Sequence, residues 1–331
     1  MIMKSPFTGK EMKCVYEKRT WNFRGEQYEY EHTAWLCEDS GEQFTTTESD
    51  TAGYVQVTNQ YRAKYGIPYT DEIIAVRQRY GISAAKMSLI LGIGINQYRL
   101  YEQGEVPSVS NGRMIRSIMN PKVMLEMVES SKNELSASEY DKITTKVKAA
   151  IAESEAYKME QYETRRIFNE PRGLANGYAQ TSLGRLKHIM LYILNRCDDV
   201  WCTKMNKLLF YVDFLSYRER GMAMTGLSYR AIDFGPVPDR WDRVYSEFAE
   251  VKQDLRQAGD FVGSVLTASQ DADISMFTDD EIKVLDAVCT NFGNKSSREI
   301  SHLSHEEKAW IDYHENHERI PFCEAFSIKA I

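Results

Sequence analysis

The spacing of hydrophobic and polar residues divides the chain into regions with different periodicities. Residues 1–56 carry aromatic and threonine-rich stretches that are broken by Gly9, Gly25 and Gly41. Aromatic and β-branched residues favour strands, and glycine favours the turns between them. We therefore predict a small β module in which two strands are joined near Gly25 and a short third strand follows.

From residue 57 to residue 131 the apolar residues recur at intervals of three and four, which is the spacing of an amphipathic helix. The pattern predicts short helices over Asp71–Tyr80, Ser83–Leu91 and Ile95–Glu102, with glycines between them. Short helices joined by glycine-containing turns are typical of a helix-turn-helix. Two further helices are expected after the prolines that follow.

Residues 132–168 contain no glycine or proline and mix lysine with glutamate, which predicts a long connecting helix. A Ser-Ala-Ser-Glu sequence near its start matches a capping box. The connector and its glycine- and proline-containing linker occupy residues 132–181. Residues 182–331 then contain helices with broad apolar faces, an extended turn-rich segment, and a strand or hairpin edge over residues 259–270. We expect a multidomain protein that is mainly α with small β elements.

The chain has 331 residues, 43% of them hydrophobic, and a formal net charge of −7. That length suits two or three domains with buried cores. There is no run of about 18 apolar residues, and the first ten residues lack the apolar region of an export signal. Six irregularly spaced cysteines indicate reduced thiols rather than a disulfide framework. We expect a soluble, cytoplasmic protein without membrane contacts.

The charge is unevenly distributed along the chain. Residues 60–120 hold eight basic and four acidic residues, a net charge of +4, whereas residues 1–59 sum to −4 and the remainder to −7. Each cation that neutralises a phosphate releases a counterion, so a basic surface favours DNA. The distribution predicts a DNA-binding centre between acidic ends that attract a basic partner. The residues alone also allow a helical interaction domain with an incidental positive charge.

The segment Gly92–Gly104 reads G-x-G-I-N-x-Y-x-x-Y-E-x-G. It resembles the XRE/Cro-type helix-turn-helix of MqsA-type antitoxins. The resemblance implies that the helix from Ile95 enters the major groove. Ser83 and Lys86, at the start of the preceding helix, are candidates for phosphate contacts. One position departs from the family, because Leu100 stands where MqsA-type proteins tend to place an arginine. The candidate DNA-binding residues are Asn96, Gln97, Arg99, Ser83 and Lys86.

The N-terminal module departs from the same family at its metal site. MqsA-type antitoxins carry a zinc ribbon with two cysteine knuckles. The corresponding stretches are Ser5–Gly9 and Cys37–Gly41, in which hydroxyl residues replace three of the four cysteines. Hydroxyls are poor zinc ligands beside thiolates, so we expect a ribbon-like fold without metal or cofactor, held by side-chain-to-backbone hydrogen bonds. The alternative is a rearranged site of Cys14, Cys37 and His32.

Three stretches mark the C-terminal region: Lys207-Leu208-Leu209, Phe234-Gly235-Pro236-Val237-Pro238 and Leu303-Ser304-His305-Glu306. Residues 185–315 thereby resemble the Panacea (SocA-like) domain of antitoxins, which implies neutralisation of a toxin by direct binding. The two prolines predict a rigid turn that presents an apolar knob to a partner. The alternative is that the turn only joins two elements within the core. The candidate toxin-binding residues are Lys207, Tyr211, Tyr229, Phe234, Pro236, Val237 and Pro238.

Two H-x-x-H pairs, His302/His305 and His314/His317, lie near the C-terminus. They lack a third firm ligand, so we interpret them as capping or interface histidines rather than as a metal site. There is no Rossmann context, Walker A run or H-E-x-x-H motif, and we therefore expect no enzyme.

These observations predict the antitoxin of a toxin–antitoxin pair. It is expected to neutralise a cognate protein toxin through its C-terminal domain and to repress its own operon by binding operator DNA as a homodimer. Two alternatives stay open. One is a prophage or mobile-element transcription regulator without a toxin partner, and the other is a proteolytic adaptor for a toxin.

Overall fold

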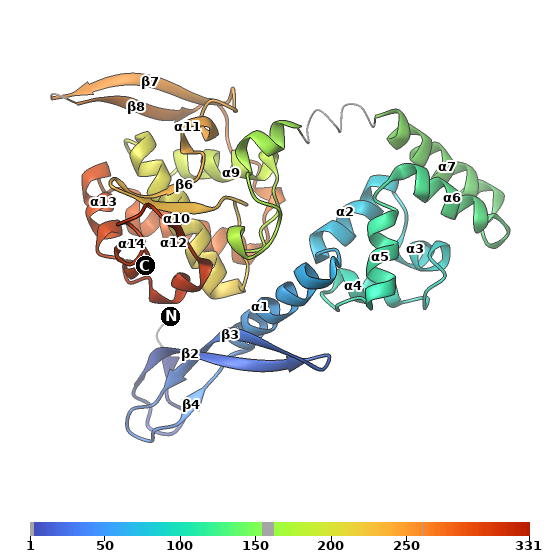
Figure 1. The fold of residues 1–331 in the computed structure, drawn as a ribbon, viewed down its shortest axis with the longest axis horizontal. Coiled ribbons are helices and arrows are strands. Elements are labelled where there is room, and N and C mark those ends of the chain that lie inside the picture. Colours follow the sequence, from blue (N-terminus) through green and yellow to red (C-terminus); the bar gives the residue numbers. More distant parts are fainter. Residues whose placement is uncertain (1–2, 154–161, 260) are drawn as a thin grey trace. The chain divides into compact units, whose positions relative to one another are not determined.

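The computed structural model describes residues 3–153, 162–259 and 261–331 (Figure 1). Within these residues the chain is mainly α-helical, and its strands form three small antiparallel sheets. The predicted fold class is confirmed. No helix in the described ranges is long and apolar enough to cross a membrane.

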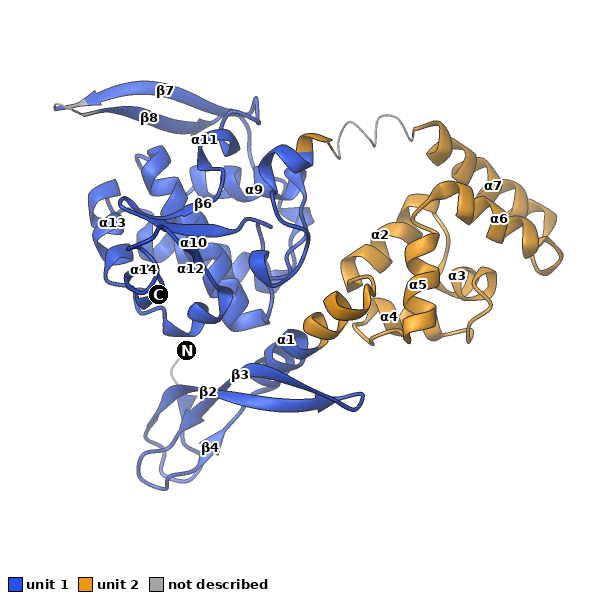
Figure 2. Cartoon of the chain, in the orientation of Figure 1, with its two compact units in different colours: residues 1–57, 164–331 blue, residues 58–163 orange. Residues whose placement is uncertain are grey.

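The chain divides into two compact units, which Figure 2 shows in different colours. Unit 1 combines residues 1–57 with residues 164–331, and unit 2 comprises residues 58–163. The division falls within helix α1 (Thr47–Tyr65). The N-terminal and C-terminal regions, which the sequence analysis treats as separate domains, therefore belong to one unit.

The N-terminal part of unit 1 is a four-stranded antiparallel sheet. Its long hairpin turns at Arg24 and Gly25, whose φ angles are 52° and 84°. The prediction of two strands joined near Gly25 and a short strand after them is confirmed. The strands are β1 (Met3–Lys4), β2 (Glu11–Phe23), β3 (Glu26–Leu36) and β4 (Gln43–Phe44).

Two loops of this sheet share one backbone hydrogen-bond pattern. The amide of Gly9 donates to the carbonyl of Ser5 at 2.9 Å, and the amide of Gly41 donates to the carbonyl of Cys37 at 2.8 Å. The Ser5 hydroxyl also accepts the amide of Thr8 at 3.3 Å. Side-chain-to-backbone hydrogen bonds hold the first loop, as the sequence predicts.

Unit 2 consists of short helices around one hydrophobic core, in which Tyr80, Met87 and Tyr98 are buried. The three helices predicted from the hydrophobic spacing are present, and the third begins at Gln97, two residues later than predicted. Two further helices follow them, as predicted. The helices are α2 (Thr70–Tyr80), α3 (Ala84–Ile90), α4 (Gln97–Glu102), α5 (Val109–Ser117), α6 (Pro121–Ser130) and α7 (Ala137–Ala152).

Helix α7 begins with the predicted capping box, in which Ser136 and Glu139 exchange side-chain-to-amide hydrogen bonds. Its Val147 and Ala150 side chains lie in the core of unit 2. The first part of the predicted connecting helix is therefore a packed element of unit 2, because its apolar residues recur at helical spacing. Residues 154–161 of that predicted helix lie outside the described residues.

The C-terminal part of unit 1 surrounds helix α10 (Cys202–Arg220) with helices, a three-stranded sheet and a separate hairpin. The strand predicted over residues 259–270 corresponds to the second strand of that hairpin. The helices are α9 (Leu183–Leu194), α11 (Trp241–Val244), α12 (Asp279–Phe292), α13 (Ser297–His305) and α14 (Lys308–Ile311). The strands are β5 (Tyr229–Ile232), β6 (Gly235–Pro238), β7 (Val251–Ala258), β8 (Phe261–Ala268) and β9 (Arg319–Ile320). The short 3₁₀ helices are η1 (Lys132–Glu134), η2 (Leu174–Asn176), η3 (Ile274–Met276) and η4 (Phe322–Ser327).

Helix α10 is buried over most of its length, and its buried Lys204, Asn206 and Asp213 side chains have internal hydrogen-bond partners. The carboxylate of Asp213 accepts the backbone amides of Met224 and Thr225, both at 2.8 Å, and the hydroxyls of Thr225 and Tyr229. Burial raises the pKa of Asp213 to about 6, although the hydrogen bonds with Thr225 and Tyr229 oppose this shift. The network ties the turn after α10 and strand β5 to the helix.

Close packing joins the N-terminal sheet and α1 to the C-terminal part of unit 1. The rings of Tyr16 and Phe326 lie 5.4 Å apart. Gly221 follows α10 with a φ of 69°, and an added Cβ atom would lie 2.5 Å from the carbonyl oxygen of Ala52 in α1. Because a backbone atom cannot move aside as a side chain can, this position requires glycine.

We expect Gly221→Ala to lower the free energy of unfolding more than Gly25→Ala does. Both glycines have a positive φ, which costs roughly 1–2 kcal/mol for a residue with a Cβ atom. Only Gly221 adds a clash, because nothing lies within 4 Å of a Cβ atom placed at Gly25. Urea denaturation of both variants measures the difference. Equal losses would show that the approach to α1 does not constrain position 221.

Candidate functional sites

Helices α3 and α4 pack against each other in unit 2, and buried tyrosines anchor α4. Tyr98 is fully buried; its hydroxyl donates to the carbonyl of Ile73 at 2.8 Å, and its amide donates to the Ser88 hydroxyl at 3.1 Å. Tyr101, almost one turn later, is also buried. The tyrosines therefore fix which face of α4 is left to solvent.

Asn96 and Arg99, two of the candidate DNA-binding residues, are exposed at the start of α4. Ile95 and Leu100 are exposed beside them in the sequence, at 74% and 38%. Leu100, the position at which the sequence departs from the expected arginine, is thus accessible to solvent. The exposed part of α4 combines amide, guanidinium and apolar side chains.

The other three candidate DNA-binding residues have partners within unit 2. Gln97 donates to the carboxylate of Glu105 at 3.0 Å. The Ser83 hydroxyl caps α3 by accepting an amide, and Lys86 forms an ion pair with Glu139 of α7 at 3.1 Å. A base or phosphate contact by Gln97 or Lys86 would have to replace these internal contacts.

Four of the arginines that make this region basic hold its backbone together. Arg62 is only 2% exposed, and its guanidinium donates to the carbonyls of Pro68, Gly104 and Glu105. The other arginines that donate to backbone carbonyls are Arg77, Arg79 and Arg116. The net charge of this region therefore overstates the number of cations available to phosphates.

The structure places six of the seven candidate toxin-binding residues in the interior, and only Phe234 is exposed, at 72%. The expectation of an exposed Gly-Pro-Val-Pro knob is therefore wrong. The alternative, that this stretch joins elements within the core, describes the structure. The buried residues are Lys207, Tyr211, Tyr229, Pro236, Val237 and Pro238.

The physical reason is that the two prolines lie in a strand. Strand β6 pairs with β5 at the edge of the three-stranded sheet and packs against α10 and α13. Pro236 pairs with Ala231, and Pro238 pairs with Tyr229. Proline has no amide hydrogen, and an edge strand tolerates this because its outer side needs no donor. The prolines therefore mark a buried edge strand rather than an exposed turn.

The backbone of Phe234 is fixed, although its side chain is exposed. Its carbonyl oxygen accepts a hydrogen bond from the side chain of Lys207. Gly235 follows with a φ of 96°, and an added Cβ atom there would lie 2.7 Å from Lys207 and 2.9 Å from Ser304. The tip of the β5–β6 hairpin thus presents one large aromatic side chain on an ordered backbone.

Two basic groups near the Phe234 carbonyl, Lys207 and His305, both have lowered pKa values. Burial lowers the pKa of Lys207 to about 7. Burial also lowers the pKa of His305, and the nearby Lys207 charge lowers it further. Desolvation disfavours the charged forms, so both side chains lose their protons more readily than they would in water.

Two of the C-terminal histidines enclose Trp310. Both imidazole rings stack on the indole. The distance between ring centroids is 4.3 Å for His305 and 4.1 Å for His314. The indole nitrogen donates to the carbonyl of Ile232 at 2.8 Å, which ties this stack to the end of β5. Across the described parts of the chain, no three His, Cys, Asp or Glu side chains gather as a metal site.

Hydroxyl groups surround the thiol of Cys37 in the N-terminal sheet. Hydrogen bonds from Ser40 and Ser5 lower the pKa of this buried thiol to about 6. The Thr8 hydroxyl lies 3.8 Å from its sulfur. The four knuckle positions therefore meet, but they supply one sulfur and three hydroxyls. The alternative three-ligand site with Cys14 and His32 is not formed among the described residues.

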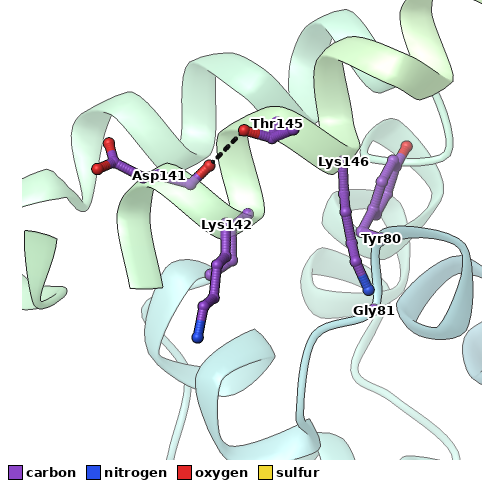
Figure 3. A pocket seen from close by; sticks show the side chains of 7 residues that line it. Tyr80, Gly81, Asp141, Lys142, Thr145 and Lys146 are labelled. Atoms are coloured by element: carbon purple, nitrogen blue, oxygen red, sulfur yellow. Dashed lines mark hydrogen bonds between the residues drawn. The ribbon is translucent and has the colours of Figure 1, made fainter. Parts of the chain in front are cut away.

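An open pocket of about 440 Å³ lies beside α7 in unit 2 (Figure 3). Lys146 extends over Gly81, and its nitrogen lies 2.0 Å from the position of an added Cβ atom. No candidate DNA-binding residue lines this pocket, so it supports none of those assignments. Its lining residues are Tyr80, Gly81, Asp141, Lys142, Ile143, Thr145 and Lys146.

The region around α10 matches a known protein family. Residues 205–311 match the family model described as the antitoxin SocA-like, Panacea domain. No curated protein and no solved structure matches the chain. The matched segment is a Panacea domain of the antitoxin SocA-like family, and it contains both Phe234 and Lys207, which holds its carbonyl. The matched family is one of antitoxin domains.

We expect Lys207→Met to change how stability depends on pH. The folded protein binds the Lys207 proton only below about pH 7, whereas the unfolded chain binds it up to the ordinary lysine pKa near 10.5. The unfolded state therefore binds more protons between these values. Relative to the variant, the wild type gains about 1.4 kcal/mol of unfolding free energy for each pH unit of increase in this window.

Urea denaturation at about pH 7.5 and pH 9.5 measures this slope. Tyr61→Phe, which changes a buried aromatic residue of unit 2 outside the Panacea domain, serves as the control and should leave the slope unchanged. A wild-type protein and Lys207→Met variant with parallel pH profiles would show that Lys207 keeps its proton in the folded state.

Proposed function

We propose that the protein is the antitoxin of a toxin–antitoxin pair, that it neutralises its toxin by direct binding through the C-terminal domain, and that it represses its own operon through unit 2. It acts as a binding protein rather than as an enzyme. The observation that carries the proposal is the match of residues 205–311 to the SocA-like antitoxin family.

We propose that the toxin contact centres on Phe234. Large aromatic side chains dominate the binding free energy of many protein interfaces, and they bind best where little conformational freedom is lost. Phe234 meets both conditions, because its side chain is exposed and its carbonyl is held by Lys207. The acidic charge of the C-terminal region favours a basic toxin face.

Unit 2 supports the proposed DNA-binding role. Its α3 and α4 are consecutive, packed helices, and the α4 start leaves Asn96 and Arg99 exposed. Asparagine can pair with adenine, and arginine can pair with guanine or phosphate. A homodimer would place two copies of α4 on a palindromic operator.

We propose further that the N-terminal sheet is a ribbon that has replaced its metal with hydrogen bonds. Two loops with the same backbone pattern bring Ser5, Thr8, Cys37 and Ser40 together. Four residues around one point are the arrangement of a tetrahedral zinc site, and hydroxyl-to-thiol hydrogen bonds here take the place of metal–ligand bonds.

Phe234→Ala is expected to weaken binding to the protein encoded by the adjacent open reading frame by about 30-fold, the effect of losing a 2 kcal/mol interface residue. Isothermal titration calorimetry and rescue of growth measure the effect. Leu255→Ala, which removes another exposed apolar side chain (80%) on β7, is the matched control. Undiminished binding by a folded Phe234→Ala variant would place the interface elsewhere.

Asn96→Ala combined with Arg99→Ala is expected to abolish binding to the DNA upstream of the gene and to leave toxin neutralisation intact. Each lost contact between a side chain and a base costs about 1–3 kcal/mol of binding free energy. Gel-shift titration at fixed salt measures DNA binding, and growth rescue measures neutralisation. Arg256→Ala, which removes an exposed cation of unit 1, is the charge control. A folded double variant that loses both activities contradicts the separation of roles.

A further inference from the structure

Two cysteines of unit 1 lie side by side in a position that the antitoxin role does not use. Cys197 follows helix α9, and Cys289 lies in the last turns of α12. They are 7% and 8% exposed, and the Cys197 sulfur lies 3.3 Å from the position of a Cβ atom added at Gly293, about one helical turn after Cys289. Neither cysteine belongs to the stretches that mark the Panacea resemblance. The pair is thus a separate chemical feature.

The surrounding backbone holds these sulfurs together. The amide of Asp198 donates to the carbonyl of Gly293, at the end of α12, at 3.0 Å. The buried Lys204 side chain donates to the carbonyls of both Asp198 and Gly293, at 2.6 and 2.7 Å. An added Cβ atom at Gly293 would lie 3.3 Å from the Cys197 sulfur. The segment after α9 is therefore clamped against the end of α12.

The two thiols are chemically unequal. The interaction with the Cys289 thiol lowers the pKa of Cys197 against the opposing effect of burial, and the positive charges of Lys204 and Arg196 lower it further. The same interaction raises the pKa of Cys289. A thiolate is the nucleophilic form of cysteine, and Cys197 rather than Cys289 lines the adjacent cavity, so Cys197 is the reactive partner.

A cavity gives a small molecule access to the reactive thiol. Cys197 lines an open cavity of about 420 Å³ together with Asp198, Asp199 and Arg256. Hydrogen peroxide is much smaller than this space. Cys289 is not among the lining residues, so a reagent that enters the cavity meets Cys197 first.

We propose that Cys197 and Cys289 are a redox-active pair that a hydroperoxide converts reversibly into a disulfide. The Cys197 thiolate attacks one oxygen of the peroxide, the O–O bond breaks, and the other oxygen leaves and takes up a proton as water or an alcohol. Cys197 is then a sulfenic acid. The Cys289 sulfur attacks the Cys197 sulfur, the S–O bond breaks, and the hydroxide leaves as water with the Cys289 proton. The two thiols lose two electrons, which reduce the peroxide.

The disulfide would link the segment after α9 to α12 and enclose the part of the chain that carries α10 and the β5–β6 hairpin. Closing a long loop restricts the unfolded chain, so the oxidised protein is expected to melt at a higher temperature than the reduced protein. A dithiol reductant reverses the step by thiol–disulfide exchange.

To test this, the full-length reduced protein is treated with hydrogen peroxide and its remaining thiols are alkylated. Its peptides are then mapped by mass spectrometry under non-reducing conditions. The expected product is a Cys197–Cys289 cross-linked peptide, with the loss of two free thiols per chain and their recovery after dithiothreitol. Cys197 oxidised to sulfinic acid without a cross-link, or no reaction at either cysteine, would overturn the proposal.

Two variants separate the steps. Cys289→Ser should leave Cys197 as a sulfenic acid that dimedone traps, whereas wild-type protein should be trapped far less because the disulfide forms. Cys323→Ser, which changes an exposed cysteine, is the control and should form the same cross-link as wild type. Equal dimedone trapping in wild type and Cys289→Ser would show that Cys289 does not resolve the sulfenic acid. The mapping of unmutated protein decides the question even where a variant fails to fold.

Discussion

The carboxylate of Asp213 is the group on which the β5–β6 hairpin of the Panacea domain depends. It lies within a buried helix, where an unpaired charge would be strongly unfavourable. Two amides and two hydroxyls satisfy it, and they belong to the turn after α10 and to the first residue of β5. The same helix supplies Lys207, which holds the carbonyl at the hairpin tip. Helix α10 thus holds the start of β5 through Asp213 and the turn after β5 through Lys207, and both side chains lie inside an apolar core.

Local sequence patterns predicted the helices of unit 2 well, because glycines and helical spacing are local signals. They predicted the Panacea domain but misplaced its surface. Lys207 and Tyr229 have polar side-chain ends and belong to the motifs that marked the domain. Inside the protein, however, Lys207 donates to the carbonyl of Phe234 and Tyr229 donates to the carboxylate of Asp213. These partners lie 27 and 16 residues away along the chain, so no local pattern reveals them. A buried polar residue with a partner and an exposed binding residue have the same appearance in a sequence.

Non-local packing also explains the division into units. The contact of Gly221 with Ala52 and the Tyr16–Phe326 ring pair join segments that are separated by all of unit 2 in the sequence. Composition places a boundary between such segments, whereas packing unites them. Charge counting has a similar limit, because Arg62 counts toward a basic surface in the sequence but is buried against backbone carbonyls in the structure.

The prolines of β6 have a consequence for how partners can approach the Panacea domain. Amides alternate between the two sides of a strand, and the β5–β6 pairing needs the amides of Gly235 and Val237, so the residues directed away from β5 are Pro236 and Pro238. The outer side of this strand therefore has carbonyl acceptors and no donors. An incoming peptide cannot extend the sheet there by β-augmentation. A partner bound at this edge would therefore have to be recognised through side chains rather than through added strand pairing.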